Sequence, residues 1–249
     1  MQSIKMLGVR VDDATYADLL ARMRAFVESG QPHHIVTLNP EMLVLAARDP
    51  GFRRLLNAAD LNVPDGIGLM LAARLLGHPL RERVTGSDGI YYLAAECARL
   101  GYRPFFLGGA PGVSETAARR LAAAYPGLDV AGTYAGSPCV EEEDDIVQYV
   151  RAAAPDLLFV AYGVPAEEEW IARNAQRLGV PVMIGVGGAF DFVAGVTRRA
   201  PVWMRRAGLE WFHRLVHQPW RWRRQLALPH FVILVLGQRL HRARPDHHA

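Results

Sequence analysis

The sequence predicts an α/β fold: a Rossmann-like, mostly parallel sheet with helices on both faces, plus a helical, basic C-terminal appendage. Short apolar or β-branched runs alternate with longer runs of helical periodicity, and capping residues and glycines punctuate the boundaries. Beyond about Thr197 the strand pattern stops, and arginines alternate with tryptophans instead. We therefore expect a core over residues 1–196 and an appendage over residues 197–249.

Seven short runs have the composition of buried strands. They are Leu7–Val11, His34–Leu38, Leu61–Val63, Pro104–Leu107, Val130–Thr133, Leu157–Ala161 and Val182–Val186. In a parallel sheet built from such runs, ligands bind in the crevice beyond the carboxyl ends of the strands. The residues that follow these runs are therefore the first candidates for a functional site.

Runs of helical periodicity lie between the predicted strands. They are Tyr16–Glu28, Pro40–Arg48, Gly66–Leu76, Gly89–Leu100, Ser114–Tyr125, Glu142–Ala153 and Ala166–Leu178. Asn39 before Pro40 is a favourable N-cap followed by proline at the first helical position, whereas Asp12 or Asp13, and Ser87 or Asp88, are candidate caps elsewhere. Glycines such as Gly30 mark the helix ends.

The charge of the chain is unevenly distributed. Of its 249 residues, 1–196 hold 17 Lys+Arg and 23 Asp+Glu, a balance of −6, whereas residues 197–249 hold 11 and 2, a balance of +9. Such a basic end indicates an anionic partner: a phosphate, a membrane surface or a nucleic acid. Cys97 and Cys139, the only cysteines, do not make a disulfide framework or a zinc motif. No secretory segment follows Met1, so we expect a cytoplasmic protein.

Asp65 lies in the most informative segment, between a short apolar run and a helical run. Pro64 stiffens the chain before it, and Gly66 lets the backbone turn and a ligand approach. Two interpretations stand: Asp65 either caps the helix Gly66–Leu76 or is a functional carboxylate at the ligand-binding edge of the sheet.

Further candidates follow the other predicted strands, and each also fits ordinary turn chemistry. Thr37 and Asn39 follow one strand, and Gly108 and Gly109 form a glycine-rich turn after another. That turn could present backbone N–H groups to a phosphate, although it is not a GxGxxG sequence. Glu167 and Asp191 lie in the loops after the last two strands, and Arg83 precedes a capped helix as a candidate anion ligand.

The basic, aromatic appendage admits three interpretations. Arginines with stacking aromatics suit nucleic acid, and tryptophan with basic residues suits an anionic membrane surface. Alternatively, some arginines fold back over the cleft and hold a diphosphate, for which the guanidinium has bidentate geometry.

Several motifs together resemble one family, the WecG/TagA/CpsF glycosyltransferases (glycosyltransferase family 26), from about His34 through Arg224. The motifs are Thr37-Leu38-Asn39-Pro40-Glu41, Pro64-Asp65-Gly66-Ile67-Gly68, Arg83-Val84-Thr85-Gly86-Ser87-Asp88, Phe106-Leu107-Gly108-Gly109, Gly163-Val164-Pro165, Glu168 with Trp170, Gly185 through Asp191, Arg198-Arg199-Ala200-Pro201, Glu210-Trp211 and the stretch Pro219–Arg224. Their order and spacing are far more specific than any single motif.

The resemblance implies an inverting, metal-independent hexosyltransferase without a cofactor. Members similar to this chain move a hexose or N-acetylhexosamine, such as N-acetylmannosamine, from a UDP-sugar to a sugar on undecaprenyl diphosphate, for teichoic acid or other surface polysaccharides. It implies that Asp65 is the general base, that Thr37, Asn39 and Arg83 line the pocket, and that appendage arginines approach the diphosphate: Arg214, Arg221 and Arg224. The expected location is peripheral, on the inner face of the plasma membrane, and a homo-oligomer is a further expectation.

Two adjacent positions depart from the family pattern. The family usually has Gly-x-Pro-Lys-Gln-Glu where this chain has Ala166 and Glu167, and an ionised glutamate does not donate a hydrogen bond as glutamine does. The donor sugar is therefore open. One alternative is an α/β protein that binds nucleic acid through its tail. Another is a dehydrogenase or another nucleotide-sugar enzyme that uses Gly108-Gly109, but the chain lacks the GxGxxG sequence and a matching carboxylate for the ribose.

Overall fold

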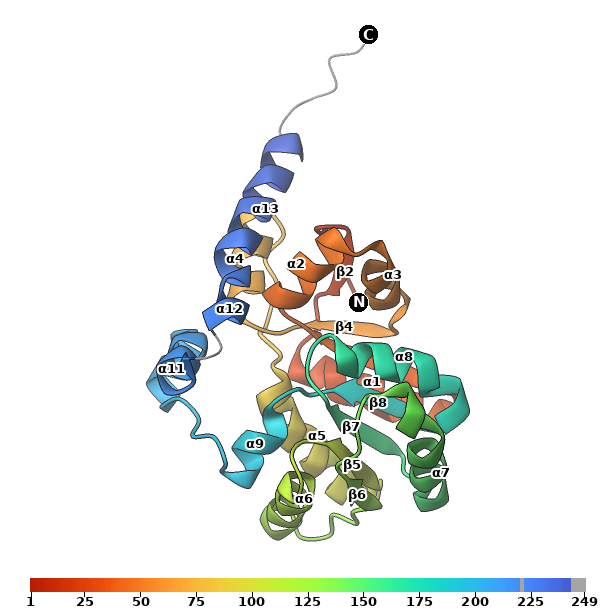
Figure 1. Cartoon of the computed structure of the whole chain (residues 1–249). Coiled ribbons are helices and arrows are strands. Elements are labelled where there is room, and N and C mark those ends of the chain that lie inside the picture. Colours follow the sequence, from red (N-terminus) through yellow and green to blue (C-terminus); the bar gives the residue numbers. More distant parts are fainter. Residues whose placement is uncertain (220–221, 243–249) are drawn as a thin grey trace.

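A parallel sheet of six strands forms the centre of the computed structural model, which describes residues 1–219 and 222–242 (Figure 1). The strand order is β4-β3-β8-β7-β5-β6, and every pairing within this sheet is parallel. The strands are β3 (His33–Leu38), β4 (Leu61–Pro64), β5 (Pro104–Gly108), β6 (Gly132–Tyr134), β7 (Leu157–Ala161) and β8 (Val182–Gly185). The predicted fold class is confirmed.

The central strands are apolar along their whole length because both faces of the sheet are covered. All residues of β5 and β7 are buried. Successive residues point to opposite faces: Phe106 and Phe159 belong to one hydrophobic cluster, and Phe105 and Leu158 to another. This double burial explains why the strands appear in the sequence as continuous apolar runs and not as an alternating pattern.

Helices cover both faces, as expected. One cluster contains buried side chains of α1 (Tyr16–Ser29), α5 (Gly86–Leu100), α6 (Val113–Ala124) and α9 (Ala189–Ala194). On the opposite face lie α2 (Pro40–Arg48), α3 (Pro50–Ala58), α4 (Ile67–Leu75), α7 (Glu143–Ala153) and α8 (Ala166–Leu178). A short 3-10 helix, Val140–Glu142, precedes α7.

Two predicted features of the N-terminal region are wrong. The run Leu7–Val11 is not one strand, because Leu7 and Gly8 both have positive φ and form the turn of a hairpin between β1 (Ser3–Met6) and β2 (Val9–Asp12). The cap of α1 is Thr15, in a reciprocal capping box with Asp18, and not Asp12 or Asp13. Helix α5 likewise begins earlier than predicted, after the cap Thr85.

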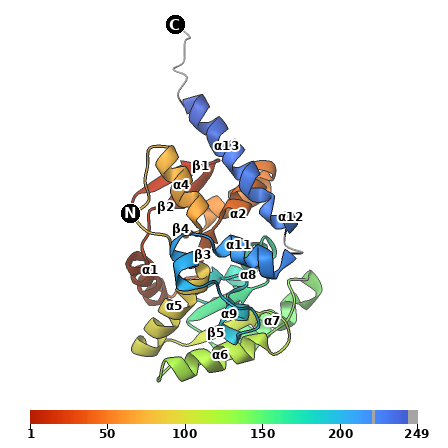
Figure 2. The ribbon, with the colours of Figure 1, turned by 90° about the vertical axis from the view of Figure 1, so that its left-hand side faces the viewer.

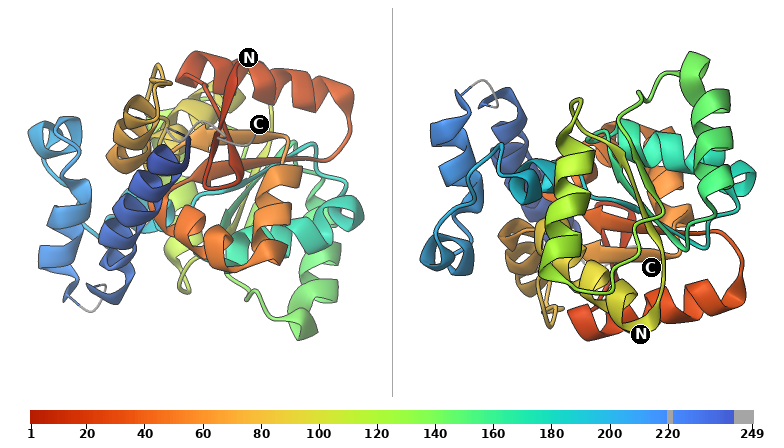
Figure 3. Two further views of the ribbon diagram at one scale, coloured as in Figure 1. Left: turned by 90° about the horizontal axis from the view of Figure 1, so that it is seen from above. Right: turned by 90° about the horizontal axis from the view of Figure 1, so that it is seen from below.

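The C-terminal segment is helical in its described part and folds back against the core. It contains α10 (Val202–Arg206), α11 (Glu210–His217), α12 (Trp222–Gln225) and α13 (Ala227–Arg242). Figures 2 and 3 show α11 beside the sheet edge and α13 running diagonally past α2 and α4. Phe231 and Val235 of α13 are buried in the same cluster as α2. Among the helices of the described residues, none has the length and apolarity to cross a membrane.

Candidate active site

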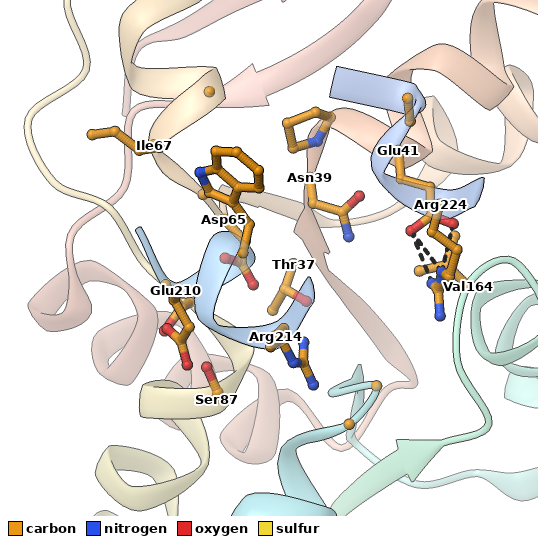
Figure 4. Close-up of a pocket in the computed structure, with 18 of the residues that line it drawn as sticks. Thr37, Asn39, Glu41, Asp65, Ile67, Ser87, Val164, Glu210, Arg214 and Arg224 are labelled. Carbon is orange, nitrogen blue, oxygen red and sulfur yellow. Dashed lines mark hydrogen bonds and ion pairs between the residues drawn. The ribbon is translucent and has the colours of Figure 1, made fainter. Parts of the chain in front are cut away.

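A cavity of about 260 Å³ lies where the carboxyl ends of β3, β4, β7 and β8 meet the appendage. Its lining includes Thr37, Asn39, Asp65, Glu167 and Arg214, so residues from both parts of the chain complete it. Figure 4 shows Asp65, Thr37 and Asn39 around one space, with Glu210 and Arg214 approaching it from α11. The cavity therefore lies at the edge of the sheet where the sequence predicts a functional site.

Asp65 is not the cap of the helix that follows it. The N-cap position of α4 is Gly66, and no side chain makes a capping hydrogen bond there. The carboxylate instead accepts a hydrogen bond through Oδ2 from the backbone N–H of Gly86, at 3.1 Å, in the first turn of α5. Helix α5 already has Thr85 as its cap, so Asp65 is held in place by a helix that does not depend on it for capping.

Burial raises the pKa of Asp65 to about 7, against the hydrogen bond from Gly86, which lowers it. The charge of Glu210 adds to the increase, whereas Arg83 and Arg214 act in the opposite direction. Desolvation therefore outweighs the stabilisation of the ionised form by the first turn of α5. A carboxylate with a pKa near neutrality is well suited to accept and release a proton.

Thr37 and Asn39 position the end of β3 beside Asp65. The Thr37 hydroxyl donates to the carbonyl of Gly185 at 3.1 Å, which ties the end of β3 to the end of β8. Asn39 is the N-cap of α2, as predicted, and accepts from the N–H of Met42 through Oδ1 at 3.1 Å. Because the cap uses the oxygen, the amide nitrogen of Asn39 remains as a hydrogen-bond donor toward the cavity that the residue lines.

Arg214 brings a positive charge from α11 to this edge of the sheet. Its guanidinium lies 4.5 Å from the ring centroid of Phe192, and its Nε is buried without a hydrogen-bond partner among the described residues. Burial lowers the pKa of the guanidinium, which stays charged at any physiological pH. A buried arginine with a donor left unpaired is a site prepared for an anion.

Glu210, the neighbour of Arg214 on α11, also lines the cavity. Arg199 links Glu210 (3.5 Å) to Asp88 of α5 (2.6 Å) and so fixes α11 against the core. Glu41 likewise holds Arg224 of α12 with hydrogen bonds of 2.8–3.2 Å. We had assigned neither Glu41 nor Glu210 to the site. Glu210 could have been noticed as one of two acidic residues in the basic tail.

Arg83 and Arg224 both line the cavity, each with part of its guanidinium already engaged. Arg83 donates through Nη2 to the carbonyl of Arg205 at 2.8 Å, and thereby contacts α10 of the appendage. Arg224 is the partner of Glu41. Both arginines therefore also hold the appendage closed over the core.

Glu167 lies in the first turn of α8 and joins two of the loops that form the cavity. Its Oε2 accepts hydrogen bonds from the N–H groups of Gly163, at 2.9 Å, and Gly187, at 3.0 Å. The side chain is almost fully buried, at 2% exposure, yet it contributes to the cavity wall.

Three predicted site residues are not part of this cavity lining. Gly108 is the last residue of β5, one strand beyond β7, and Gly109 follows it. A Cβ on Gly108 would lie 2.8 Å from the backbone of Ala161, so glycine is needed there for strand packing. Asp191 lies on α9 behind Gly188. Arg221 lies outside the described residues. The roles assigned to these four positions stay predictions.

Gly188 offers a test of the position of Arg214. A Cβ on Gly188 would stand 2.7 Å from Nη2 of Arg214, so Gly188→Ala should displace the guanidinium and leave the core intact. We expect roughly a tenfold loss of kcat/KM at an unchanged melting temperature. Gly237→Ala, with no atom within 4 Å of its added Cβ, is the matched control. Unchanged activity of Gly188→Ala would show that the guanidinium is not needed where it lies.

The fold and the site define a class: an α/β enzyme whose cleft combines a carboxylate of near-neutral pKa with arginines suited to a phosphate-bearing substrate. In the part of the chain that the structure describes, no group of three or more His, Cys, Asp or Glu residues is placed to hold a metal ion.

Comparison with known proteins identifies the family. The family model described as the Glycosyl transferase WecG/TagA/CpsF family matches residues 4–245, and the chain belongs to this family. It is similar to the N-acetylglucosaminyldiphosphoundecaprenol N-acetyl-beta-D-mannosaminyltransferase of Bacillus spizizenii, with 34% identity over 89% of this chain and 86% of the relative. The enzyme of the same name from Bacillus subtilis is 31% identical over 88% of this chain and 88% of the relative. A Staphylococcus aureus enzyme of the same name is 30% identical over 92% and 90%. The chain is therefore a glycosyltransferase.

Proposed function

We propose that this glycosyltransferase moves N-acetylmannosamine, or a closely related hexose, from its UDP-sugar to a sugar on undecaprenyl diphosphate, in cell-surface polysaccharide assembly. The relatives are named for transfer to N-acetylglucosaminyldiphosphoundecaprenol, and they match 88–92% of this chain. The observation that carries the proposal is the cavity itself, which is lined by Asp65 of the core together with Arg214 and Arg224 of the appendage.

In this proposal Asp65 is the general base. An inverting transfer needs a group that takes the proton from the acceptor hydroxyl while the hydroxyl oxygen attacks the anomeric carbon and the bond to UDP breaks. A carboxylate positioned for this step typically contributes about 10²–10⁴-fold in rate. Its pKa near 7 leaves a large share of Asp65 ionised at neutral pH and gives the carboxylate more proton affinity than an ordinary aspartate.

Arg214 is the proposed stabiliser of the leaving group. Negative charge develops on the diphosphate as the glycosidic bond breaks, and preorganised cations in a water-poor site stabilise it strongly. Arg214 supplies such a charge with an unpaired buried Nε, and Arg83 and Arg224, which also line the cavity, supply two more. We therefore propose transfer that proceeds without a metal ion or cofactor, and expect turnover to persist in excess chelator.

The appendage also carries the proposed membrane contact. Large apolar side chains on α10 to α13 are exposed, and basic residues of the appendage such as Arg198 and Arg239 are exposed too. The exposed apolar residues include Trp203, Phe212, Val216, Trp222, Ile233 and Leu240. Interfacial tryptophans with basic residues are typical of surfaces that bind anionic lipid, and the proposed acceptor is anchored in such a membrane. We propose peripheral binding at the inner face of the plasma membrane.

Flotation with vesicles of anionic phospholipid tests this contact. The double change Ile233→Ser with Leu240→Ser removes two exposed apolar side chains of α13, and we expect it to lower the vesicle-bound fraction at least fivefold. Val140→Ser is the control, because Val140 is equally exposed but lies in the Rossmann-like region and not in the appendage. Equal binding of both variants and the unchanged protein would contradict the proposed surface.

Release of UDP from a panel of UDP-sugars tests the substrate assignment. The assay needs a short-chain prenyl-diphosphate N-acetylglucosamine as acceptor, so that detergent or membrane effects do not limit the rate. We expect UDP-N-acetylmannosamine to give the highest kcat/KM. We also expect UDP to be released only when the acceptor is present. A preference for another UDP-hexose would correct the sugar, and acceptor-independent release with every donor would contradict the transfer.

A further inference from the structure

Two adjacent glutamates, Glu167 and Glu168, are buried at the start of α8 behind the cavity. Glu168 is fully buried and bonds His34 of β3 through Oε2 at 2.6 Å, while its Oε1 has no hydrogen-bond partner among the described residues. A Cβ on Gly185 would lie 2.5 Å from that Oε1 and 3.1 Å from Cγ of Glu167, so glycine at the end of β8 makes room for both side chains.

The two oxygens of Glu167 have different environments. Oε2 accepts both backbone hydrogen bonds, from Gly163 and Gly187. No described residue donates to Oε1, which lies 3.6 Å from the position that a Cβ on Gly187 would occupy. Gly187 and Gly188 line the cavity, and Arg214 reaches Gly188. Oε1 is therefore the oxygen left to interact with a ligand on the diphosphate side of the cavity.

Ionisation of Glu167 at this position is unfavourable. Burial is the largest cause, the charge of Glu168 adds to it, and together they raise the pKa of Glu167 to about 8, although the two N–H groups and Arg224 act in the opposite direction. Arg224 is itself paired with Glu41, and His34 contacts Glu168 and not Glu167. A negative charge on Glu167, whose Oε1 lies near Gly187, would also repel a diphosphate held by Arg214.

We propose that Glu167 acts as a neutral carboxylic acid whose Oε1–H donates a hydrogen bond to a phosphate oxygen of the nucleotide substrate. This inference rests on the proposed function, because it takes a nucleoside diphosphate as the ligand. A neutral acid with one accepting oxygen and one donating O–H presents the same pattern as a glutamine side chain. The departure of Glu167 from the family pattern then changes the pH range of substrate binding and not its hydrogen-bond pattern.

Calorimetric binding of UDP between pH 6.5 and 9.5 tests the proposal in three proteins. In the unchanged protein we expect the affinity to fall as pH rises above about 8, up to tenfold per pH unit, because one proton must be retained. Glu167→Gln should lose this alkaline fall, and Glu167→Ala should bind UDP about 10-fold to 100-fold more weakly at pH 7. Asp65 titrates in all three proteins, so its effect cancels in the comparison.

Glu168→Gln separates a protonation effect from a packing effect. Removing the neighbouring charge should lower the pKa of Glu167, so the loss of UDP affinity should begin at lower pH than in the unchanged protein. An alkaline fall that persists in Glu167→Gln, or a midpoint unmoved by Glu168→Gln, would overturn the proposal. So would binding by Glu167→Gln as weak as that of Glu167→Ala.

Thermal unfolding without any ligand keeps the test independent of the proposed function. A folded-state pKa of about 8, above the ordinary value of a glutamate, means that stability falls as pH rises toward 8. Glu167→Gln lacks that fall. The difference in melting temperature between this variant and the unchanged protein should therefore grow by several degrees from pH 5 to pH 8 and stay constant above pH 8. A difference that does not vary with pH would overturn the inference. If UDP does not bind at any pH while this stability pattern holds, the proposed function fails and the protonation of Glu167 stands.

Discussion

Asp65→Asn should lower kcat by about 10²–10⁴-fold, because the amide cannot accept the proton of the acceptor hydroxyl. In the unchanged enzyme, kcat/KM should fall as pH drops below about 7, since the base must be ionised and burial raises its pKa to that value. UDP binding should be retained, because asparagine keeps the size of the side chain. Rate measurements on the variant and a pH–rate profile of the unchanged enzyme check both expectations.

The same substitution should stabilise the fold above neutral pH. The raised pKa of Asp65 means that stability declines as pH rises from about 4 to 7, and asparagine removes that decline, worth roughly 4 kcal/mol at pH 8. Asp49→Ala is the control: Asp49 is a true N-cap, accepting from the N–H groups of Gly51 and Phe52, so its loss should cost about 1 kcal/mol without changing turnover per folded molecule. Destabilisation of Asp65→Asn with normal turnover would make Asp65 a structural residue.

Arg214→Gln should lower kcat/KM by about 10²–10³-fold, through loss of the cation nearest the proposed diphosphate position. Most of the loss should appear in kcat if the guanidinium stabilises the charge that develops on UDP, and in KM if it binds ground and transition states equally. Arg214→Lys should recover only part of the activity, because an ammonium lacks the planar, bidentate geometry. Steady-state kinetics with saturating acceptor separates these cases.

Arg198→Gln is the matched control for charge. Arg198 belongs to the same appendage but is exposed and does not line the cavity, so its removal should change kcat/KM less than threefold. The Arg214 variant should also fold normally, since its guanidinium has no carboxylate partner among the described ion pairs. Equal small losses in both variants would indicate that the appendage acts through general charge and not through Arg214.

Much of the core could be predicted from the sequence because its strands are buried on both faces. Runs such as Leu157–Ala161 are apolar throughout, and the structure places a strand with the same bounds. The N-terminal hairpin was missed because its turn, Leu7-Gly8, has a bulky leucine where positive φ is rare. Helix α3 was missed because it begins with Pro50-Gly51, residues that also mark turns.

The site could be predicted only in part, because strand order is not visible in a sequence. Thr37 lies near the end of β3, and Asn39, Asp65 and Glu167 follow β3, β4 and β7. These strands lie close together in the sheet with β8. The turn at Gly108 follows β5, one strand farther along, which no local pattern reveals. Charge composition indicated that the appendage meets an anion, but only the fold shows Arg214 over Phe192 and Arg224 against Glu41.

The anomeric configuration of the transferred sugar is the most direct test of base-catalysed transfer at Asp65. The reaction would run from an α-linked UDP-N-acetylmannosamine to the lipid-linked N-acetylglucosamine, and NMR of the isolated product would report the new bond. We expect a β-linked product from the unchanged enzyme and almost none from Asp65→Asn. An α-linked product, or a normal rate with Asp65→Asn, would contradict inversion by this carboxylate.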